Sequence, residues 1–344
     1  MSDSKYGSDE NTMDKMKEQI LRRRMHGLYL SRKCGDITQL SRELLGLHCW
    51  FHRNVVFSAL IRGARLNGWK TALTKTWLYR GTLHGVDYDD LPMLLSLHSN
   101  DSCSWLLNEG QLTDIADKVV RLMEDGVYSR AEMRRIFAFD LDGRTIERIF
   151  SPWGGIFVYL ARHGKVAFRN MTSRDFDLID AEPTQTPDEV LPEMLHRFFA
   201  AYGPATLTDA AWFFGLAKDD KKKLSLLNLD EFAHLEDNGN VYFYVDDNTV
   251  MGDIPELTLL SGFDPLIVSY AERSAILPPE YKSSVILKSG ICQPTIAVNG
   301  QVAGLWNIKK HEPVVDFFET QPKRIKDITY DLVEDIRRQT AGTM

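Results

Sequence analysis

The segment His48-Cys49-Trp50-Phe51-His52 places two imidazoles, a thiol and an indole within five residues. A neutral imidazole can hold a water molecule and accept its proton, whereas an indole can stack on a flat base or on a cation. Such a cluster could therefore do chemistry on a flat aromatic ligand. The same residue types also fill the cores of small helical modules, which is the commoner situation for an isolated buried His or Trp. The pattern alone leaves both interpretations open.

The flanking residues predict a short turn between two helices for this segment. Asp36 opens the first helix, and Gly46 is suited to end it, because glycine reaches left-handed backbone angles without a Cβ penalty. Apolar residues at helical spacing indicate the second helix: Val55, Val56, Ala59, Leu60 and Ala64. His48 and Trp50 would then lie near a helix N-terminus, which offers N–H groups and a partial positive charge.

A second group of polar residues lies in the segment 75–86, whose aromatic and β-branched residues predict a strand. Side chains alternate between the two faces of a strand, so Arg80, Thr82 and His84 are expected on the same face. Three polar groups on one face suit either solvent or a polar pocket, and the pattern does not decide between them.

Composition places the chain among ordinary globular proteins. It has 344 residues, of which 44% are apolar and 26% charged, with a net charge of −7. The four cysteines, Cys34, Cys49, Cys103 and Cys292, form no CxxC pair, so we expect reduced thiols in a cytoplasmic protein rather than a metal cage or disulfides. We expect no membrane association, since no run approaches the roughly 18 apolar residues of a membrane span. The first residues do not read as a signal peptide.

The predicted elements recur in the order of winged helix-turn-helix modules, in which helices are followed by a strand or hairpin. After a disordered tail at 1–14, we expect three such modules at 15–98, 99–172 and 173–250. The part from 251 to 344 is strand-rich, with a tight hairpin at Asn299-Gly300 and a closing helix at 328–338. The predicted fold class is therefore α+β, with tandem winged helices followed by a small C-terminal domain like a β-barrel.

Basic residues are the candidates for contact with nucleic acid, because phosphate binding requires a local positive face rather than a positive net charge. The second module has the densest basic character in the chain. The candidates are Arg22, Arg53, Arg80, His84, Arg130, Arg134, Arg144, Lys221 and Lys222. The plainer interpretation of each cluster is a solvated surface.

Four separated stretches, taken together and in this order, resemble one known family. They are Arg80-Gly81-Thr82-Leu83-His84, Ala201 to Thr206, Leu259 to Leu266 and Pro294 to Trp306. The chain resembles, over about residues 20 to 310, the winged-helix DNA-binding family that includes the alkylpurine and interstrand-crosslink DNA glycosylases. The resemblance implies tandem winged helices before a C-terminal β-barrel, and excision of N7-alkylated or crosslinked guanine from DNA.

The family's catalytic motif is only partly matched. After a Leu-Gly-hydrophobic lead-in, the family carries Gln-x-Gln or Gln-x-Asp, which is thought to position a water and to stabilise positive charge on the sugar. Leu45-Gly46-Leu47 matches the lead-in, but His48-Cys49-Trp50 follows it. Under the resemblance, His48 is the candidate base and Trp50 a stacking platform, since an indole accepts no hydrogen bond.

The resemblance also bears on two other segments. The family keeps the strand with Arg80, Thr82 and His84 beside the catalytic turn, where these residues could brace the turn or reach a phosphate. Phe263 and Asp264 are expected to organise the junction between the third module and the C-terminal domain.

Three functions of different classes follow from these observations. The first is a monofunctional DNA N-glycosylase that acts on alkylated or crosslinked double-stranded DNA as a monomer, with neither metal nor other cofactor. The second is a non-catalytic DNA-binding or regulatory relative, which the change to His48-Cys49-Trp50 favours. The third is a protein-binding module, which the net negative charge keeps open.

Overall fold

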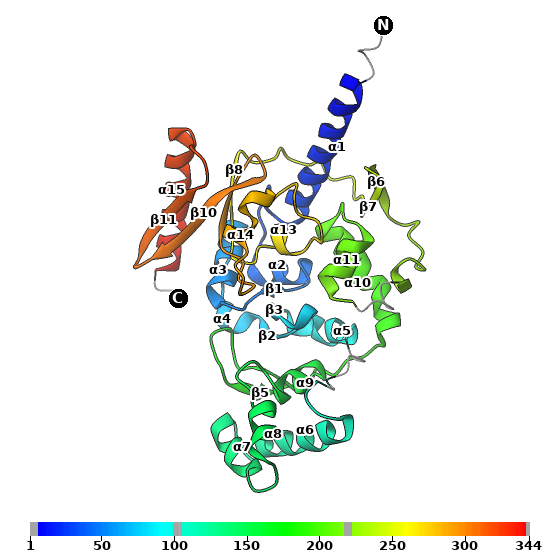
Figure 1. Cartoon of the computed structure of the whole chain (residues 1–344), viewed down its shortest axis with the longest axis vertical. Coiled ribbons are helices and arrows are strands. Elements are labelled where there is room, and N and C mark those ends of the chain that lie inside the picture. The colour runs from blue at the N-terminus through cyan, green and yellow to red at the C-terminus, as the bar shows by residue number, and fades with distance from the viewer. Residues whose placement is uncertain (1–5, 99–102, 104, 217–221, 342–344) are drawn as a thin grey trace. The chain divides into compact units, whose positions relative to one another are not determined.

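The structure is a computed structural model that describes residues 6–98, 103, 105–216 and 222–341 (Figure 1). The chain divides into two compact units. The first unit combines Met1–Asn67 with Leu195–Met344, and the second unit is Gly68–Met194. Helices and strands both contribute to each unit, so the α+β class is confirmed. Within the described ranges, no helix combines the length with the apolar character needed to cross a membrane.

The first unit begins with α1 (Tyr6–Gly27), α2 (Ile37–Glu43), the two-residue strand β1 (Leu47–His48) and α3 (His52–Ile61). Helix α1 starts inside the range expected to be a tail, and residues 1–5 lie outside the described ones. The Asp36 carboxylate accepts a hydrogen bond of 3.0 Å from the Gln39 amide, so Asp36 caps α2 as predicted.

The chain returns to the first unit within α10 (Pro187–Tyr202), which is followed by α11 (Leu207–Phe214) and the hairpin of β6 (Ala233–Asp237) and β7 (Asn240–Tyr244). Asn238 and Gly239 have φ of 49° and 75°, which is the left-handed geometry that a two-residue hairpin turn requires. The Asn238-Gly239 pair in the sequence predicts this hairpin, and the pairing of β6 with β7 confirms it. The residue pattern of 218–227 predicts a further helix, and this segment falls partly outside the described residues.

The C-terminal part of the first unit is an open antiparallel sheet of four strands, in the order β11-β10-β9-β8. Its strands are β8 (Leu257–Leu260), β9 (Thr295–Val298), β10 (Gln301–Lys309) and β11 (Glu312–Phe317). The short helices α13 (Pro265–Val268), η3 (Pro279–Tyr281) and α14 (Lys282–Val285) lie between β8 and β9 in the chain, and α15 (Lys323–Thr340) follows β11.

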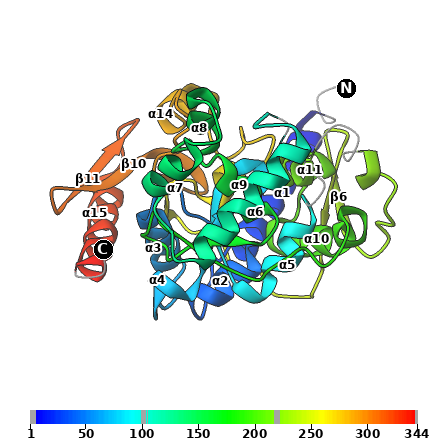
Figure 2. The same cartoon turned by 90° about the horizontal axis from the view of Figure 1, so that it is seen from below.

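The predicted barrel is wrong, because β8 and β11 are the two edges of this open sheet in the described residues. Figures 1 and 2 show α15 lying along β10 and β11. Val333 and Ile336 on α15 pack in a core cluster with Ile296 and Trp306 of the sheet. The apolar face of the sheet is thus buried by a helix, which removes the need to close the sheet on itself.

Helix α3 is fixed to this sheet. Phe57 belongs to the same core cluster as Leu259, Ile296 and Trp306, and its ring centroid lies 5.0 Å from that of Trp306. The buried Trp306 indole donates a hydrogen bond of 2.9 Å to the Leu260 carbonyl. The helix that directly follows His48-Cys49-Trp50 is therefore anchored in the core of the C-terminal part.

The second unit begins with α4 (Trp69–Ala72), β2 (Thr74–Trp77), the 3-10 turn η1 (Tyr79–Gly81), β3 (Leu83–Val86), the 3-10 turn η2 (Tyr88–Asp90) and α5 (Leu91–Ser96). The single strand predicted over 75–86 is wrong. Strands β2 and β3 form an antiparallel hairpin, because Arg80 and Gly81 turn the chain with φ of 55° and 65°. Arg80 therefore lies on a turn and does not share a strand face with His84.

The rest of the second unit has α6 (Glu109–Glu124), α7 (Arg130–Phe137), α8 (Gly143–Ile149), α9 (Ile156–Arg162), β4 (Val166–Phe168) and β5 (Phe176–Leu178). The sequence predicts a helix over 144–159 that is interrupted around Pro152, and the structure has two helices, α8 and α9, with the break at 150–155. Strand β5 was not predicted. Within this unit the strand order is β3-β2-β4-β5.

Candidate active site

The residues predicted to do chemistry lie on a tight corner between α2 and α3. Leu45 and Gly46 both adopt left-handed backbone angles, with φ of 55° and 108°, and the Gly46 amide donates a hydrogen bond of 2.8 Å to the Ser41 carbonyl. Gly46 thus ends the helix as predicted, although Leu45 shares the turn. Strand β1 and residues 49–51 then lead into α3, which begins at His52. We call residues 48–52 the histidine corner.

The side chains of the histidine corner divide between core and surface. Cys49 is fully buried, so it fills the core. Trp50 and Phe51 are each 37% exposed, and His48 is half-buried. A tryptophan packed in the core would be buried, so Trp50 is not part of the core packing. The corner therefore presents an indole and part of an imidazole at the surface of the first unit.

Phe263 supports the His48 ring from a segment far away in the sequence. The two rings stack face to face, with centroids 4.1 Å apart and planes 4° from parallel. Phe263 has a φ of 57°, which is unusual for an aromatic residue, and its amide donates to the Cys292 carbonyl at 3.3 Å. Phe263 was expected to organise a domain junction, and no sequence pattern linked it to His48.

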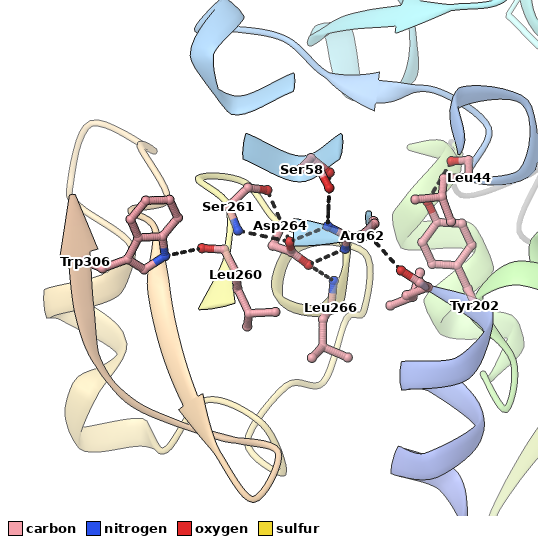
Figure 3. Close-up of polar contacts among 10 residues, drawn as sticks. Leu44, Ser58, Arg62, Tyr202, Leu260, Ser261, Asp264, Leu266 and Trp306 are labelled. Atoms are coloured by element: carbon pink, nitrogen blue, oxygen red, sulfur yellow. Dashed lines mark hydrogen bonds and ion pairs between the residues drawn. The ribbon is translucent and has the colours of Figure 1, made fainter. Parts of the chain in front are cut away.

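The turn that carries Phe263 is held by a buried ion pair (Figure 3). The Arg62 guanidinium donates two hydrogen bonds, of 3.0 and 2.9 Å, to the two oxygens of Asp264, and both side chains are fully buried. Asp264 also accepts bonds of 3.1 Å from the amide and hydroxyl of Ser261 and from the Leu266 amide. The carboxylate therefore neutralises Arg62 and fixes residues 261–266.

Arg62 extends the same network towards α1, since its Nε donates 2.8 Å to the Leu28 carbonyl. In parallel, the Tyr202 hydroxyl of α10 donates 2.7 Å to the Leu44 carbonyl, just before the corner (Figure 3). Sequence reasoning did not single out Arg62, although an arginine that directly follows the mainly apolar run 55–61 is a signal for a buried partner.

His84 is buried in the second unit on β3. Its Nδ1 lies 3.1 Å from the Thr82 carbonyl oxygen, which can only accept, so Nδ1 carries the proton. Burial, with a smaller effect of the Arg80 charge, lowers the pKa of His84 from 6.5 to about 4. A buried neutral ring favours a positioning role over direct contact with phosphate.

The depressed pKa of His84 predicts how stability depends on pH. Below pH 6.5 the unfolded chain gains a proton at this ring that the folded chain does not bind, so stability is lost as pH falls towards 4. The contribution should be about 2 kcal/mol between pH 7.5 and pH 5. Urea unfolding of His84→Asn at both pH values should show a correspondingly flatter dependence. The exposed His311, changed to Asn, is the matched control and should keep the wild-type slope.

Two of the candidate DNA-binding arginines lie in the first unit. Arg22 pairs with Asp253 and, at 3.6 Å, with Glu18. Arg53 is half-buried in the first turn of α3, and its guanidinium lies 5.9 Å from the Phe51 ring centroid. Lys222 is exposed, and Lys221 falls outside the described residues. Arg22 is thus largely neutralised by its neighbours.

The basic residues of the second unit differ in how free they are to reach a ligand. Arg130 donates 3.0 Å to the Ser151 carbonyl and lies 5.0 Å over the Phe157 ring, and burial lowers its pKa. Arg134 pairs with Glu147 at 2.7 Å. Arg144 is exposed in the first turn of α8. Arg144 is therefore the best placed of these for a phosphate.

No group of three or more His, Cys, Asp or Glu side chains is arranged to hold a metal ion within the part of the chain that the structure describes.

Comparisons with known proteins agree on one family. The model of the family "DNA glycosylase AlkZ-like" matches residues 70–318. The interstrand DNA cross-link repair glycosylase of Streptomyces sahachiroi is 27% identical over 274 residues, which is 72% of this chain and 73% of that protein. The structure of DNA glycosylase AlkZ from the same organism shares the fold, with a TM-score of 0.76 at 24% identity over 93% of this chain and 96% of the other. Because the family model covers most of its length, the chain belongs to the AlkZ-like DNA glycosylase family.

Proposed function

We propose that this protein is a monofunctional DNA N-glycosylase that excises N7-alkylated or crosslinked guanine from double-stranded DNA, acting as a monomer. The supporting observation is the histidine corner of an AlkZ-like chain, where an imidazole stands after the Leu45-Gly46-Leu47 lead-in. A crosslink-repair glycosylase among its relatives supports the substrate class. We also propose that the modules 15–98, 99–172 and 173–250 are winged helices, followed by the C-terminal part 251–344.

The proposed reaction needs little acid catalysis. Alkylation of N7 gives guanine a positive charge, so the bond between N9 and C1′ breaks with its electron pair passing to the base, which leaves neutral. Positive charge then develops on the sugar, and a water molecule attacks C1′. In the proposal His48 holds this water and accepts the proton that it loses, while nearby carbonyl and side-chain dipoles stabilise the charged sugar.

Trp50 has a different role in the proposal. Its indole accepts no hydrogen bond, so it cannot be the base. The residue is 37% exposed, and in the proposal its ring stacks on the alkylated purine or on a neighbouring base. Such stacking contributes about 0.5–2 kcal/mol to binding.

The function is tested with duplexes that carry a single N7-methylguanine, a bulkier N7-alkylguanine or a crosslink. After incubation, alkali cleaves the strand wherever a base has been lost. Cleavage at the lesion supports the proposal. Binding without cleavage would indicate instead a non-catalytic DNA-binding relative, which is what the loss of the family's Gln-x-Gln pattern favours.

Binding to duplex DNA is expected to weaken steeply with salt. Neutralisation of a few phosphates releases counterions, so affinity should fall more than about tenfold between about 50 and 200 mM salt. Arg144→Ala should reduce the salt slope by about 1, since Arg144 is exposed on α8. Arg134→Ala is the matched control with a smaller expected effect, because Arg134 is already paired with Glu147.

Fluorescence anisotropy with an unmodified duplex measures these affinities. A protein that binds DNA with no salt dependence, or binds none, would contradict the DNA-binding part of the proposal. Such a result would favour the protein-binding alternative.

A further inference from the structure

Phe263 differs from an ordinary packing residue in two ways. Its side chain is only half-buried, and its backbone has a φ of 57°. A side chain with a Cβ strains the left-handed region, and strain of this kind persists only where the surroundings over-determine the conformation. A half-exposed phenylalanine gains little from burial in return for that strain. The arrangement therefore requires an explanation beyond core packing.

The surroundings of Phe263 hold it from both sides. Before it, Gly262 lies against the buried Asn54 of α3, where an added Cβ would be 2.8 Å from the amide oxygen. After it, Asp264 is fixed by the two hydrogen bonds from Arg62, at the other end of α3. Both anchors lie on or next to the helix that starts at the histidine corner. The position of Phe263 relative to His48 is thus set by α3 itself.

The consequence of this bracing is a fixed plane for the His48 ring. At a centroid separation of 4.1 Å with planes 4° from parallel, the imidazole cannot turn about its Cβ–Cγ bond without striking the phenyl face. Nδ1 of His48 is buried, so in the proposal Nε2 is the nitrogen that acts on the water. A ring held in one plane directs Nε2 along one line.

We infer that Phe263 is a positioning residue for catalysis: its stacked ring fixes the imidazole of His48 so that Nε2 faces the water that attacks C1′. The inference rests on the proposed function of His48. It assigns to the Ser261–Leu266 turn a task beyond joining two parts of the first unit. The strained backbone of Phe263 is the structural cost of placing a ring against His48.

The test compares Phe263→Leu, which keeps an apolar side chain without a ring, with Phe263→Tyr, which keeps the ring. Release of 7-methylguanine from duplex DNA is followed at saturating enzyme in a single turnover. Phe263→Leu should lower the rate constant about 10- to 100-fold, because misplacement of a catalytic group has effects of this size. The Kd for the duplex should stay unchanged, and Phe263→Tyr should restore most of the rate.

A double-mutant cycle with His48→Ala separates positioning from general support. Without the imidazole, Phe263→Leu should have no further effect on the rate constant. A full effect of Phe263→Leu in the His48→Ala protein, or a wild-type rate for Phe263→Leu alone, would overturn the inference. If Phe263→Leu folds poorly, Phe263→Gly takes its place, since glycine adopts the left-handed backbone without strain.

A readout that does not depend on the reaction is the NMR spectrum of histidine-labelled protein. The carbon-bound protons of the His48 ring should be shifted by the ring current of Phe263, and this shift should be lost in Phe263→Leu and kept in Phe263→Tyr. Wild-type protein that releases no base would overturn the proposed function and this inference together. Release by the wild type with an unaffected Phe263→Leu variant would overturn the inference alone.

Discussion

Substitution of His48 by alanine is expected to lower the single-turnover rate constant for base release by about 100-fold. A positioned general base accelerates a reaction by about 10²- to 10⁴-fold. We expect an effect at the lower end of this range, because the alkylated guanine is already cationic and leaves with little help from an acid. The Kd for the duplex should change by less than about threefold, since a half-buried imidazole backed by Phe263 supplies little binding energy by itself.

The family pattern offers a matched variant for this experiment. His48→Gln places at this position the residue type that the resemblance implies, and glutamine can accept and donate hydrogen bonds. We expect it to keep the rate constant within about tenfold of wild type, because it can still hold a water. Trp50→Phe, which keeps a stacking ring, should change Kd more than the rate constant. An unchanged rate constant for His48→Ala would show that His48 is not the general base.

Removal of one partner of the buried pair Arg62–Asp264 is expected to destabilise the folded protein by about 3–5 kcal/mol. Arg62→Met leaves a fully buried carboxylate without its counter-charge, and Asp264→Ala leaves a fully buried guanidinium. Asp264→Ala should be the worse variant, since Ser261 and Leu266 also lose an acceptor. Urea unfolding gives the free energies.

The exposed pair Arg324–Glu256 in the same unit is the matched control. Its side chains are 61% and 49% exposed, so Arg324→Met should cost less than about 1 kcal/mol. Equal losses for Arg324→Met and Arg62→Met would contradict the view that burial makes the Arg62–Asp264 pair important. A stable Arg62→Met protein would also weaken the argument that α3 fixes the Phe263 turn.

Local signals in the sequence predicted much of the secondary structure. The two Asn-Gly hairpins were found because asparagine and glycine together supply the left-handed angles that these turns need: 49° and 75° at residues 238 and 239, and 49° and 81° at residues 299 and 300. Asp36 marked the start of the helix before the corner, and Gly46 marked its end, for equally local reasons. Signals of this kind act within a few residues of the chain.

The predictions that failed needed information beyond the local pattern. Arg80-Gly81 turns the chain within a run that looked continuous, because Arg80 adopts a left-handed conformation that its residue type does not indicate. The strand-rich C-terminal part suggested a barrel, but α15 buries the face of the sheet. Whether a sheet closes or is covered depends on packing between distant elements.

The candidate site likewise combines features that local sequence signals predicted with features that depend on contacts between distant residues. The cluster at His48 could be recognised from residue types, and its proposed role follows from the resemblance. Residue types did not reveal which residues hold the cluster in place. Phe263 contacts His48, and Arg62 contacts Asp264, across some two hundred positions of the sequence. The Leu259 to Leu266 stretch was recognised as a motif, yet the stacking of its phenylalanine on an imidazole exists only in the folded protein.

The most direct test of the central claim is to measure, by mass spectrometry, the free base released from duplex DNA that contains one N7-methylguanine. Wild-type and His48→Ala proteins are compared at saturating enzyme in a single turnover, with a no-enzyme sample for spontaneous loss. The account predicts intact 7-methylguanine from the wild type, and about 100-fold slower release from His48→Ala. Release at the spontaneous rate with wild-type protein on every alkylated or crosslinked substrate would contradict it.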